Sequence, residues 1–187
     1  GMKNATSVID RYWEMAVAKG RDANPHRLAF LQLVGVAETH AEAEEYAAHP
    51  EYFFHKLLHT PSHYMAIPGC LEYDALVRAM QNTSREAVDL RAMTFKEFRE
   101  RGFVVTGSPK TVREQLMDGV KRLRCGHLLT LLHFGSMPTA LCKKNIDLFA
   151  REVLPHLEGL WDDEWEDRWW PERLRNKTRK PAMARAS

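Results

Sequence analysis

The sequence predicts an α/β fold built on parallel strands. Between residues 102 and 157, short apolar runs alternate with amphipathic helical patterns, which is the repeating unit of a parallel sheet. About three strands of this kind are present, whereas the closed barrel that they suggest needs eight strands and about 250 residues. The predicted fold is therefore a partial (β/α)8 TIM barrel of about three parallel strands with flanking helices.

Composition fits one domain of ordinary globular character. The chain has 187 residues, 44% apolar and 28% charged, with a formal net charge of +2, which gives no general electrostatic reason to bind nucleic acid or acidic lipid. Cys70, Cys125 and Cys142 are widely spaced, so we expect no disulfide framework and a cytoplasmic location. No apolar run approaches the roughly 20 residues that span a bilayer, and we expect no membrane partner.

The first element is predicted to be a helix from Ser7 to about Lys19, followed by a strand. Ser7 is the expected cap, Gly20 the expected stop, and the expected buried face is Ile9, Trp13, Ala16 and Val17. The run from Leu28 to Val36 is almost entirely apolar and suits a strand covered on both faces. The spacing of Thr39 and Glu42 is that of a capping box, which predicts a helix after this strand.

The stretch from about residue 50 to residue 100 is predicted to be a helical insertion rather than a separate domain. It includes a short aromatic helix, EYFFHKLLH, and another helix near Tyr73 to Met80, with prolines between them. Thr94 and Glu97 repeat the capping-box spacing, and Gly102 is expected to end that helix.

The second and third strands are predicted at FVVTG and HLLTLLHF, as parallel neighbours bridged by a helix. Ser108 is the expected N-cap of that helix and Pro109 its first residue, where a proline costs nothing. The apolar stripe of the helix is Val112, Leu116, Val120 and Leu123. After the turn at Gly135, Met137 and Pro138, a last helix is expected to bury Ile146, Phe149, Ala150, Val153 and Leu157.

The C-terminal part divides into a tryptophan-rich segment and a basic end. Trp161, Trp165 and Trp169 recur every four residues, so we expect them to fold back over the outer helices, with a subunit interface as the alternative. The partial barrel domain is thus predicted at residues 1–171, and residues 172–187 as a basic, solvated tail.

Candidate ligand sites follow from the rule that parallel α/β sheets bind ligands outside the carboxyl ends of their strands. Gly107 and Ser108 begin a helix and could hold a phosphate or carboxylate, or simply cap that helix. The exit of the third strand offers a second set of wall residues, whose alternative role is ordinary packing. These are His133, Phe134, Gly135 and Met137.

A metal site is not expected. His49, His55, His59 and His63 cluster in sequence, but the His-Lys-Leu-Leu-His pattern lacks the glutamate of a zinc protease helix. The sequence also contains no dinucleotide-binding glycine motif, no phosphate-binding Walker loop and no nucleophile elbow.

Several motifs taken together resemble a known family. The stretch GFVVTGSPKTVREQLMDGVKRLRCGHLLTLLHFGSMP, followed by FAREVLPHL, resembles the C-terminal portion of the bacterial luciferase-like, flavin-dependent monooxygenases. The likeness spans about Asp10 to Leu157, and AKGRDANPHRLAFLQLVGVAET looks like the family's passage from helix to strand. The resemblance implies a barrel that binds FMN, a related reduced flavin or a deazaflavin, and uses O2 to oxidise a small organic substrate.

The same resemblance limits what can be transferred. The chain corresponds only to the later strands, so it is interpreted as a C-terminal fragment and no catalytic residue can be carried over. Gly107 and Ser108 are transferred as cofactor-binding residues, and the set from His133 to Met137 as substrate-pocket wall. The implied partners are flavin and a small substrate, with a flavin reductase as a further option.

Two functional readings stay open at this point. The chain is a flavin-dependent monooxygenase, or it is a non-catalytic half-barrel that binds a partner chain. A three-stranded fragment leaves open edges and a half-exposed apolar face, so we expect a homodimer, or closure by the insertion and the tryptophan segment. A nucleic-acid-binding module ranks last, because no basic patch with an aromatic platform is present.

Overall fold

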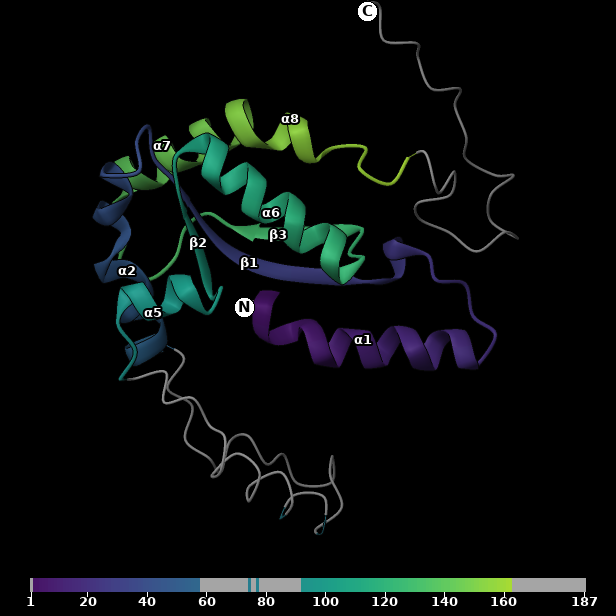
Figure 1. Cartoon of the computed structure of the whole chain (residues 1–187). Helices are drawn as coiled ribbons and strands as arrows, with labels where there is room; N and C mark the ends of the chain where they lie inside the picture. Colours follow the sequence, from purple (N-terminus) through teal and green to yellow (C-terminus); the bar gives the residue numbers. More distant parts are fainter. Residues whose placement is uncertain (1, 58–73, 75–76, 78–91, 163–187) are drawn as a thin grey trace, which may run out of the picture.

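The computed structural model describes residues 2–57, 74, 77 and 92–162. Its centre is a three-stranded sheet of β1 (Ala29–Val36), β2 (Val104–Gly107) and β3 (His127–Leu131). Both outer strands run parallel to β1, with Leu33 opposite Val104 on one side and opposite Leu131 on the other. The α/β class and the three parallel strands with flanking helices are confirmed (Figure 1).

The order of the strands differs from our expectation. The sheet runs β2-β1-β3, so β1 lies between the two strands that we expected to be neighbours. β2 and β3 nevertheless share one sheet and one direction, because each pairs in parallel with β1. Strand order depends on contacts between distant residues, and the apolar pattern of each strand does not encode it. β2 and β3 therefore form the two outer edges of the described sheet.

The helices begin and end close to the predicted positions in the second half of the chain. Ser108 caps α6 (Pro109–Leu123), and the side chain of Ser108 accepts a hydrogen bond from Thr111 N–H. Thr94 and Glu97 form the complete capping box of α5 (Phe95–Glu100). At Thr39 only half of the box forms: Thr39 Oγ1 accepts from Glu42 N–H at 3.2 Å.

The remaining helical elements connect and cover the sheet. They are α1 (Met2–Ala18), 3₁₀ turn η1 (Pro25–Arg27), 3₁₀ helix η2 (Glu42–Tyr46), α2 (Ala48–Tyr52), π-helix η3 (Phe53–Leu57), α7 (Thr139–Leu148), π-helix η4 (Phe149–Val153) and α8 (Leu154–Leu157). Figure 1 shows α2 and α5 together at one end of the sheet and α6 alongside α7 and α8. The predicted helix from Tyr73 to Met80 lies largely outside the described residues.

Alternate residues of each strand pack against two separate apolar clusters. The outer core lies under α1, α6 and η4, and it consists of Met2, Ile9, Val34, Val36, Val105, Val112, Leu116, Val120, Leu123, Cys125, Leu148, Phe149, Val153 and Trp161. The inner core lies under η2, α2, η3 and α5, and it consists of Leu33, Ala37, Ala43, Tyr46, Phe54, Met93, Phe95, Phe98, Val104, Phe134 and Met137. The described flanks of the predicted insertion thus cover part of the inner face.

Two expectations about the ends of the chain need correction. Helix α1 begins at Met2 rather than Ser7, and Val17 is exposed, although Ile9 and Ala16 are buried as expected. Trp13 Nε1 donates to Leu123 O at 3.0 Å and holds α1 against α6. The buried face of the last helix is rotated in part from the expected one.

There Phe149 and Val153 are buried as expected, and Asn145 and Leu148 are buried as well, whereas Ile146 is 45% exposed and Ala150 is also exposed. The reason for the rotation is that the Asn145 amide forms hydrogen bonds with the sheet, as described below.

The third strand and the tryptophan segment also depart in part from expectation. β3 ends at Leu131, and Leu129 is 49% exposed, so this strand is not covered on both faces. Trp161 folds back as expected: it is buried in the outer core, and its Nε1 donates to Cys125 O at 2.9 Å. Trp165, Trp169 and the predicted tail at 172–187 lie outside the described residues.

Candidate functional site

The carboxyl ends of β1 and β2 meet at one edge of the sheet, where Gly107 stands against two side chains. Its φ is +153°, a value that disfavours residues with a Cβ atom. A Cβ atom at Gly107 would lie 3.2 Å from Thr111 Cβ and 3.5 Å from His40 Nδ1. Glycine at this position therefore leaves a small cradle between β2, the segment after β1 and the start of α6.

The start of α6 supplies polar groups to this cradle. Pro109 has no N–H, Thr111 N–H donates to Ser108 Oγ, and Val112 N–H donates to Ser108 O. Within the contacts of the described residues, Lys110 N–H is the first-turn donor that remains for a ligand. The expected anion site therefore offers fewer N–H donors than the sequence suggested, because Thr111 N–H already donates to the Ser108 side chain.

His40 is a polar residue beside this cradle that was not among the site residues predicted from the sequence. Arg99 Nη2 lies 3.1 Å from His40 Nε2, and Arg99 Nη1 donates to Glu44 Oε1 at 2.7 Å. An arginine can only donate, so His40 Nε2 must accept and the ring proton sits on Nδ1, the atom nearest Gly107. The sequence signal was present, since His40 lies four residues after the end of the first strand, but it stood inside a spacing read as a capping box.

The predicted wall residues at the exit of β3 lie mainly in the inner core. Phe134 is 2% exposed and Met137 is 5% exposed, and Phe134 N–H contacts Met137 Sδ at 3.4 Å. His133 is exposed, with Nε2 3.3 Å from Met137 O. Gly135 has φ +61°, and a Cβ there would collide with His49 O. These residues form a packed turn.

Tyr46 and Gly35 explain why the inner face is closed near the strand ends. Tyr46 is 1% exposed, its hydroxyl donates to Val36 O at 2.8 Å, and its ring lies 6.2 Å from that of Phe134. A Cβ at Gly35 would stand 2.9 Å from Tyr46 Cγ, so only glycine leaves room for the ring. Burial, aided by the charge of Glu45, raises the pKa of Tyr46 to about 12. The phenol therefore stays neutral and packs as part of the core.

Asn145 joins the last helix to the sheet where the pairing of β1 with β3 ends. Its Oδ1 accepts from Val36 N–H at 2.7 Å, and its Nδ2 donates to Val34 O and Leu132 O, both at 2.8 Å. The residue is fully buried. The single polar residue thus continues the hydrogen bonding of β1 beyond the last paired position, Leu33 with Leu131.

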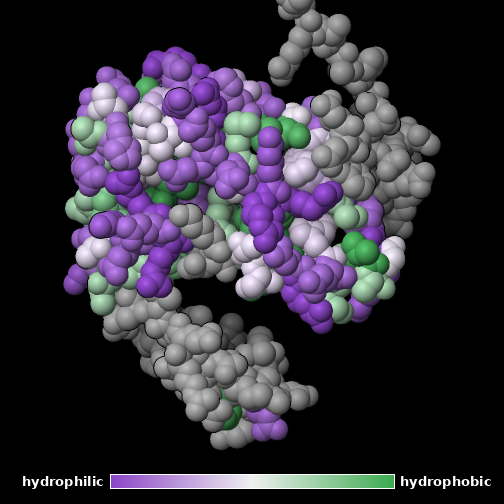
Figure 2. Space-filling view, viewed as in Figure 1, coloured by the Kyte–Doolittle hydropathy of each residue, from purple (hydrophilic) through white to green (hydrophobic). Residues whose placement is uncertain are grey.

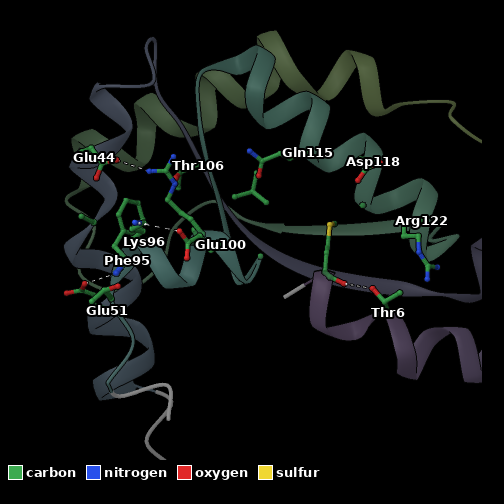
Figure 3. Close-up of a pocket in the computed structure, with 18 of the residues that line it drawn as sticks. Thr6, Glu44, Glu51, Phe95, Lys96, Glu100, Thr106, Gln115, Asp118 and Arg122 are labelled. Carbon is green, nitrogen blue, oxygen red and sulfur yellow. Dashed lines mark hydrogen bonds and ion pairs between the residues drawn. The ribbon is translucent and has the colours of Figure 1, made fainter. Parts of the chain in front are cut away.

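A cavity of about 840 Å³ lies beside the outer edge of β2. Figure 3 shows the side chains of Glu44, Glu51 and α5 on one side, Gln115, Asp118 and Arg122 of α6 on the other, and Thr106 between them. Hydrophobic surface appears only in small patches among hydrophilic side chains on the face in Figure 2. The cavity lining includes Thr106, which directly precedes Gly107, but not Gly107 or Ser108 themselves.

Two further properties concern the described part of the chain alone. Its residues include no group of three His, Cys, Asp or Glu side chains placed to hold a metal ion. His49 Nδ1 instead lies 3.1 Å from Ser136 Oγ, and burial lowers the pKa of His49. Within the same residues, each helix is too short or too polar to pass through a bilayer.

Comparisons with known proteins agree with this architecture. The family described as luciferase-like monooxygenase matches residues 2–124, more than half of the chain. The crystal structure of monooxygenase RslO1 from Streptomyces bottropensis is similar to this chain, with a TM-score of 0.50 and 16% sequence identity. The similarity covers 83% of this chain and 39% of RslO1, so the chain spans about two fifths of that enzyme's length. No curated protein matches the sequence.

Proposed function

The chain belongs to the luciferase-like monooxygenase family, and we propose that it forms the phosphate-binding edge of a flavin-dependent monooxygenase that acts on a small organic substrate. The observation that supports this proposal is the cradle at Gly107, which lies at the carboxyl end of a parallel strand in a chain of this family. Reduced flavin, when bound, supplies the electrons with which such enzymes split O2.

The residues present fit the phosphate end of a flavin. A phosphate beside Gly107 would meet two donors, Lys110 N–H and His40 Nδ1–H, and the Ser108 hydroxyl, which lies 3.1 Å from Thr111 Oγ1, would become a third by turning away from Thr111. The Arg99 guanidinium next to His40 adds positive charge to this edge. His40 is held in the donor tautomer by Arg99, and Glu44 in turn orients Arg99.

The described residues provide less for the flavin ring. Tyr46 and Phe134 fill the inner face near the strand ends, so the ring would lie outside the inner core. Gly107 and Ser108 therefore remain proposed cofactor-binding residues. His133 and Gly135 remain proposed substrate-pocket residues by position, whereas Phe134 and Met137 would act by supporting that turn from within the core.

Flavin binding tests this proposal directly. Quenching of FMN fluorescence by the purified chain should be saturable, and riboflavin, which lacks the phosphate, should bind at least tenfold more weakly. His40→Phe should weaken FMN binding severalfold and leave riboflavin binding unchanged. Gly107→Val should abolish the preference for FMN.

The matched control is Gly20→Ala. Gly20 also has a positive φ, +67°, but it has open space around it at the end of α1. Any loss that comes only from backbone strain would appear in both glycine variants. Equal affinity of the wild-type chain for FMN and riboflavin, or no saturable quenching, would contradict the proposal.

A second candidate function is a partial barrel that binds a partner chain, such as another copy of itself. The observation in its favour is the inner face near the start of the strands, where Leu31 is 53% exposed and Leu129 49% exposed on directly opposed positions of β1 and β3. Light scattering during size-exclusion chromatography tests the homodimer: a mass near 43 kDa supports it, since the chain weighs 21.6 kDa, and a monomeric mass contradicts it.

A further inference from the structure

The cavity beside β2 has the size of a small-molecule site and does not use the cradle at Gly107. Its volume of about 840 Å³ lies within the roughly 300–1,000 Å³ typical of ligand pockets. Apolar side chains from α1, α5, β2 and α6, and from the junction of η2 with α2, contribute to its lining, and these are Met2, Ala47, Phe95, Val104, Val105 and Leu123.

One buried polar atom in this lining has no partner. Thr106 is 1% exposed, and its Oγ1 is buried without a hydrogen bond from any described residue. The methyl group of Thr106 lies toward β1, because its Cγ2 is 3.0 Å from the position of a Cβ on Gly35. The hydroxyl is the other branch of the side chain, so it faces away from β1, toward the open edge of β2. Buried hydroxyls without partners are uncommon and point to a missing ligand or water.

Most of the charged side chains around the cavity already have partners within the protein. Arg99 binds Glu44, and Lys96 lies 3.9 Å from Glu100. Glu51 accepts a hydrogen bond from Phe95 N–H at 2.9 Å.

At the far end, Arg122 donates two hydrogen bonds to Asp10, each 2.8 Å long. Asp118 and Gln115 are exposed on α6. No buried, uncompensated charge among the described lining residues selects a charged ligand, whereas the apolar lining and one free hydroxyl favour a neutral one.

We propose that this cavity binds a small, uncharged molecule with an apolar body and one hydroxyl or carbonyl group, which forms a hydrogen bond with Thr106 Oγ1. The apolar body lies along Val104 and Val105 between α5 and α6. The cavity shares Arg99 and Glu44 with the support of His40, but its lining contains none of the proposed phosphate-binding residues Gly107, Ser108, Lys110 and His40, so either proposal can fail without the other.

The test compares two probes that differ by one hydroxyl, 2-naphthol and naphthalene. Titration followed by 1H–15N chemical shifts should give an affinity for 2-naphthol about fivefold above that for naphthalene, which is the effect of one net hydrogen bond. Thr106→Val keeps the shape of the side chain and removes the hydroxyl. It should abolish the fivefold preference and leave naphthalene binding unchanged.

A matched control comes from the other outer strand. Thr130→Val makes the same change in β3, away from this cavity, and should keep the preference for 2-naphthol. Thr106→Val should also unfold at the same or higher urea concentration than the wild type, because its hydroxyl loses no internal partner. FMN binding should not change in either variant.

Three outcomes would overturn the proposal. The first is a preference for 2-naphthol that survives in Thr106→Val. The second is a set of shift changes that excludes both 104–106 and the facing helices α5 and α6. The third is that neither probe binds. This outcome counts against the proposal even where its cause is a dimer in which a strand of the partner occupies the edge of β2.

Discussion

Replacing Asn145 should be among the most damaging single changes in this chain. Its amide forms three hydrogen bonds, two of them buried, with Val36 N–H and Val34 O, and one partly buried, with Leu132 O. In Asn145→Ala all three are lost, and the backbone groups of β1 stay buried without a partner. At about 1–1.5 kcal/mol for each bond, plus a small cavity, the expected loss in the free energy of unfolding is about 3–5 kcal/mol.

Urea unfolding followed by circular dichroism measures this loss, provided that the m-value is unchanged. Lys143→Ala is the matched control, because Lys143 is exposed two residues away on the same helix, and it should change stability by no more than about 0.5 kcal/mol. Asn145→Asp keeps the acceptor for Val36 N–H but removes both donations, so it should also destabilise strongly. A loss below about 1 kcal/mol in Asn145→Ala would refute the view that this amide extends the sheet.

Two further predictions concern the inner core. Gly35→Ala should cost about 1–3 kcal/mol of unfolding free energy, because its Cβ would stand 2.9 Å from Tyr46 Cγ and 3.0 Å from Thr106 Cγ2; a urea midpoint equal to that of the wild type would contradict this packing. Tyr46, whose pKa is raised to about 12, should stabilise the fold fully below pH 10 and lose that contribution as the pH rises from 10 to 12. Tyr46→Phe should lose about 1 kcal/mol at pH 8 with the hydrogen bond to Val36 O, and the gap between it and the wild type should shrink at alkaline pH; a gap that stays constant from pH 8 to 11 would count against it.

Local signals in the sequence predicted the local structure well. Ser108 and Pro109 start α6, Thr94 and Glu97 cap α5, and the stripe of α6 is buried as expected, because each feature depends on residues within one or two helical turns. The family resemblance, which rested on several such motifs in sequence, was confirmed.

Features that depend on contacts between distant residues could not be predicted from local sequence signals. The position of β1 between β2 and β3 follows from backbone pairing across 70 to 100 residues of chain. The buried face of the last helix includes Asn145 and leaves Ile146 exposed, because the Asn145 amide forms hydrogen bonds with the backbone of the sheet. Phe134 was placed at a ligand wall because nothing local reveals that Tyr46 packs beside it.

The site at Gly107 was found from sequence only in part. Glycine followed by a helix cap pointed to the carboxyl end of β2, but the contribution of His40 needs the fold, which brings the segment after β1 next to α6. The pairing of His40 with Arg99 crosses 59 positions in the sequence, and no spacing rule covers it. A histidine in the short segment that follows a predicted parallel strand is the one signal that could have indicated it.

The proposed phosphate site and the proposed partner-binding surface lie at opposite ends of the strands, with β1 at the centre of the sheet. Near the strand ends, Tyr46 and Phe134 close the inner face, and the proposed phosphate site lies at the edge at Gly107. Near the strand starts, Leu31 and Leu129 stay exposed side by side, so a covering chain could bury them without displacing either aromatic ring. Leu31→Lys should therefore abolish any dimer seen by light scattering and leave FMN binding unchanged, whereas loss of both together would show that the chain must assemble before it can hold a flavin.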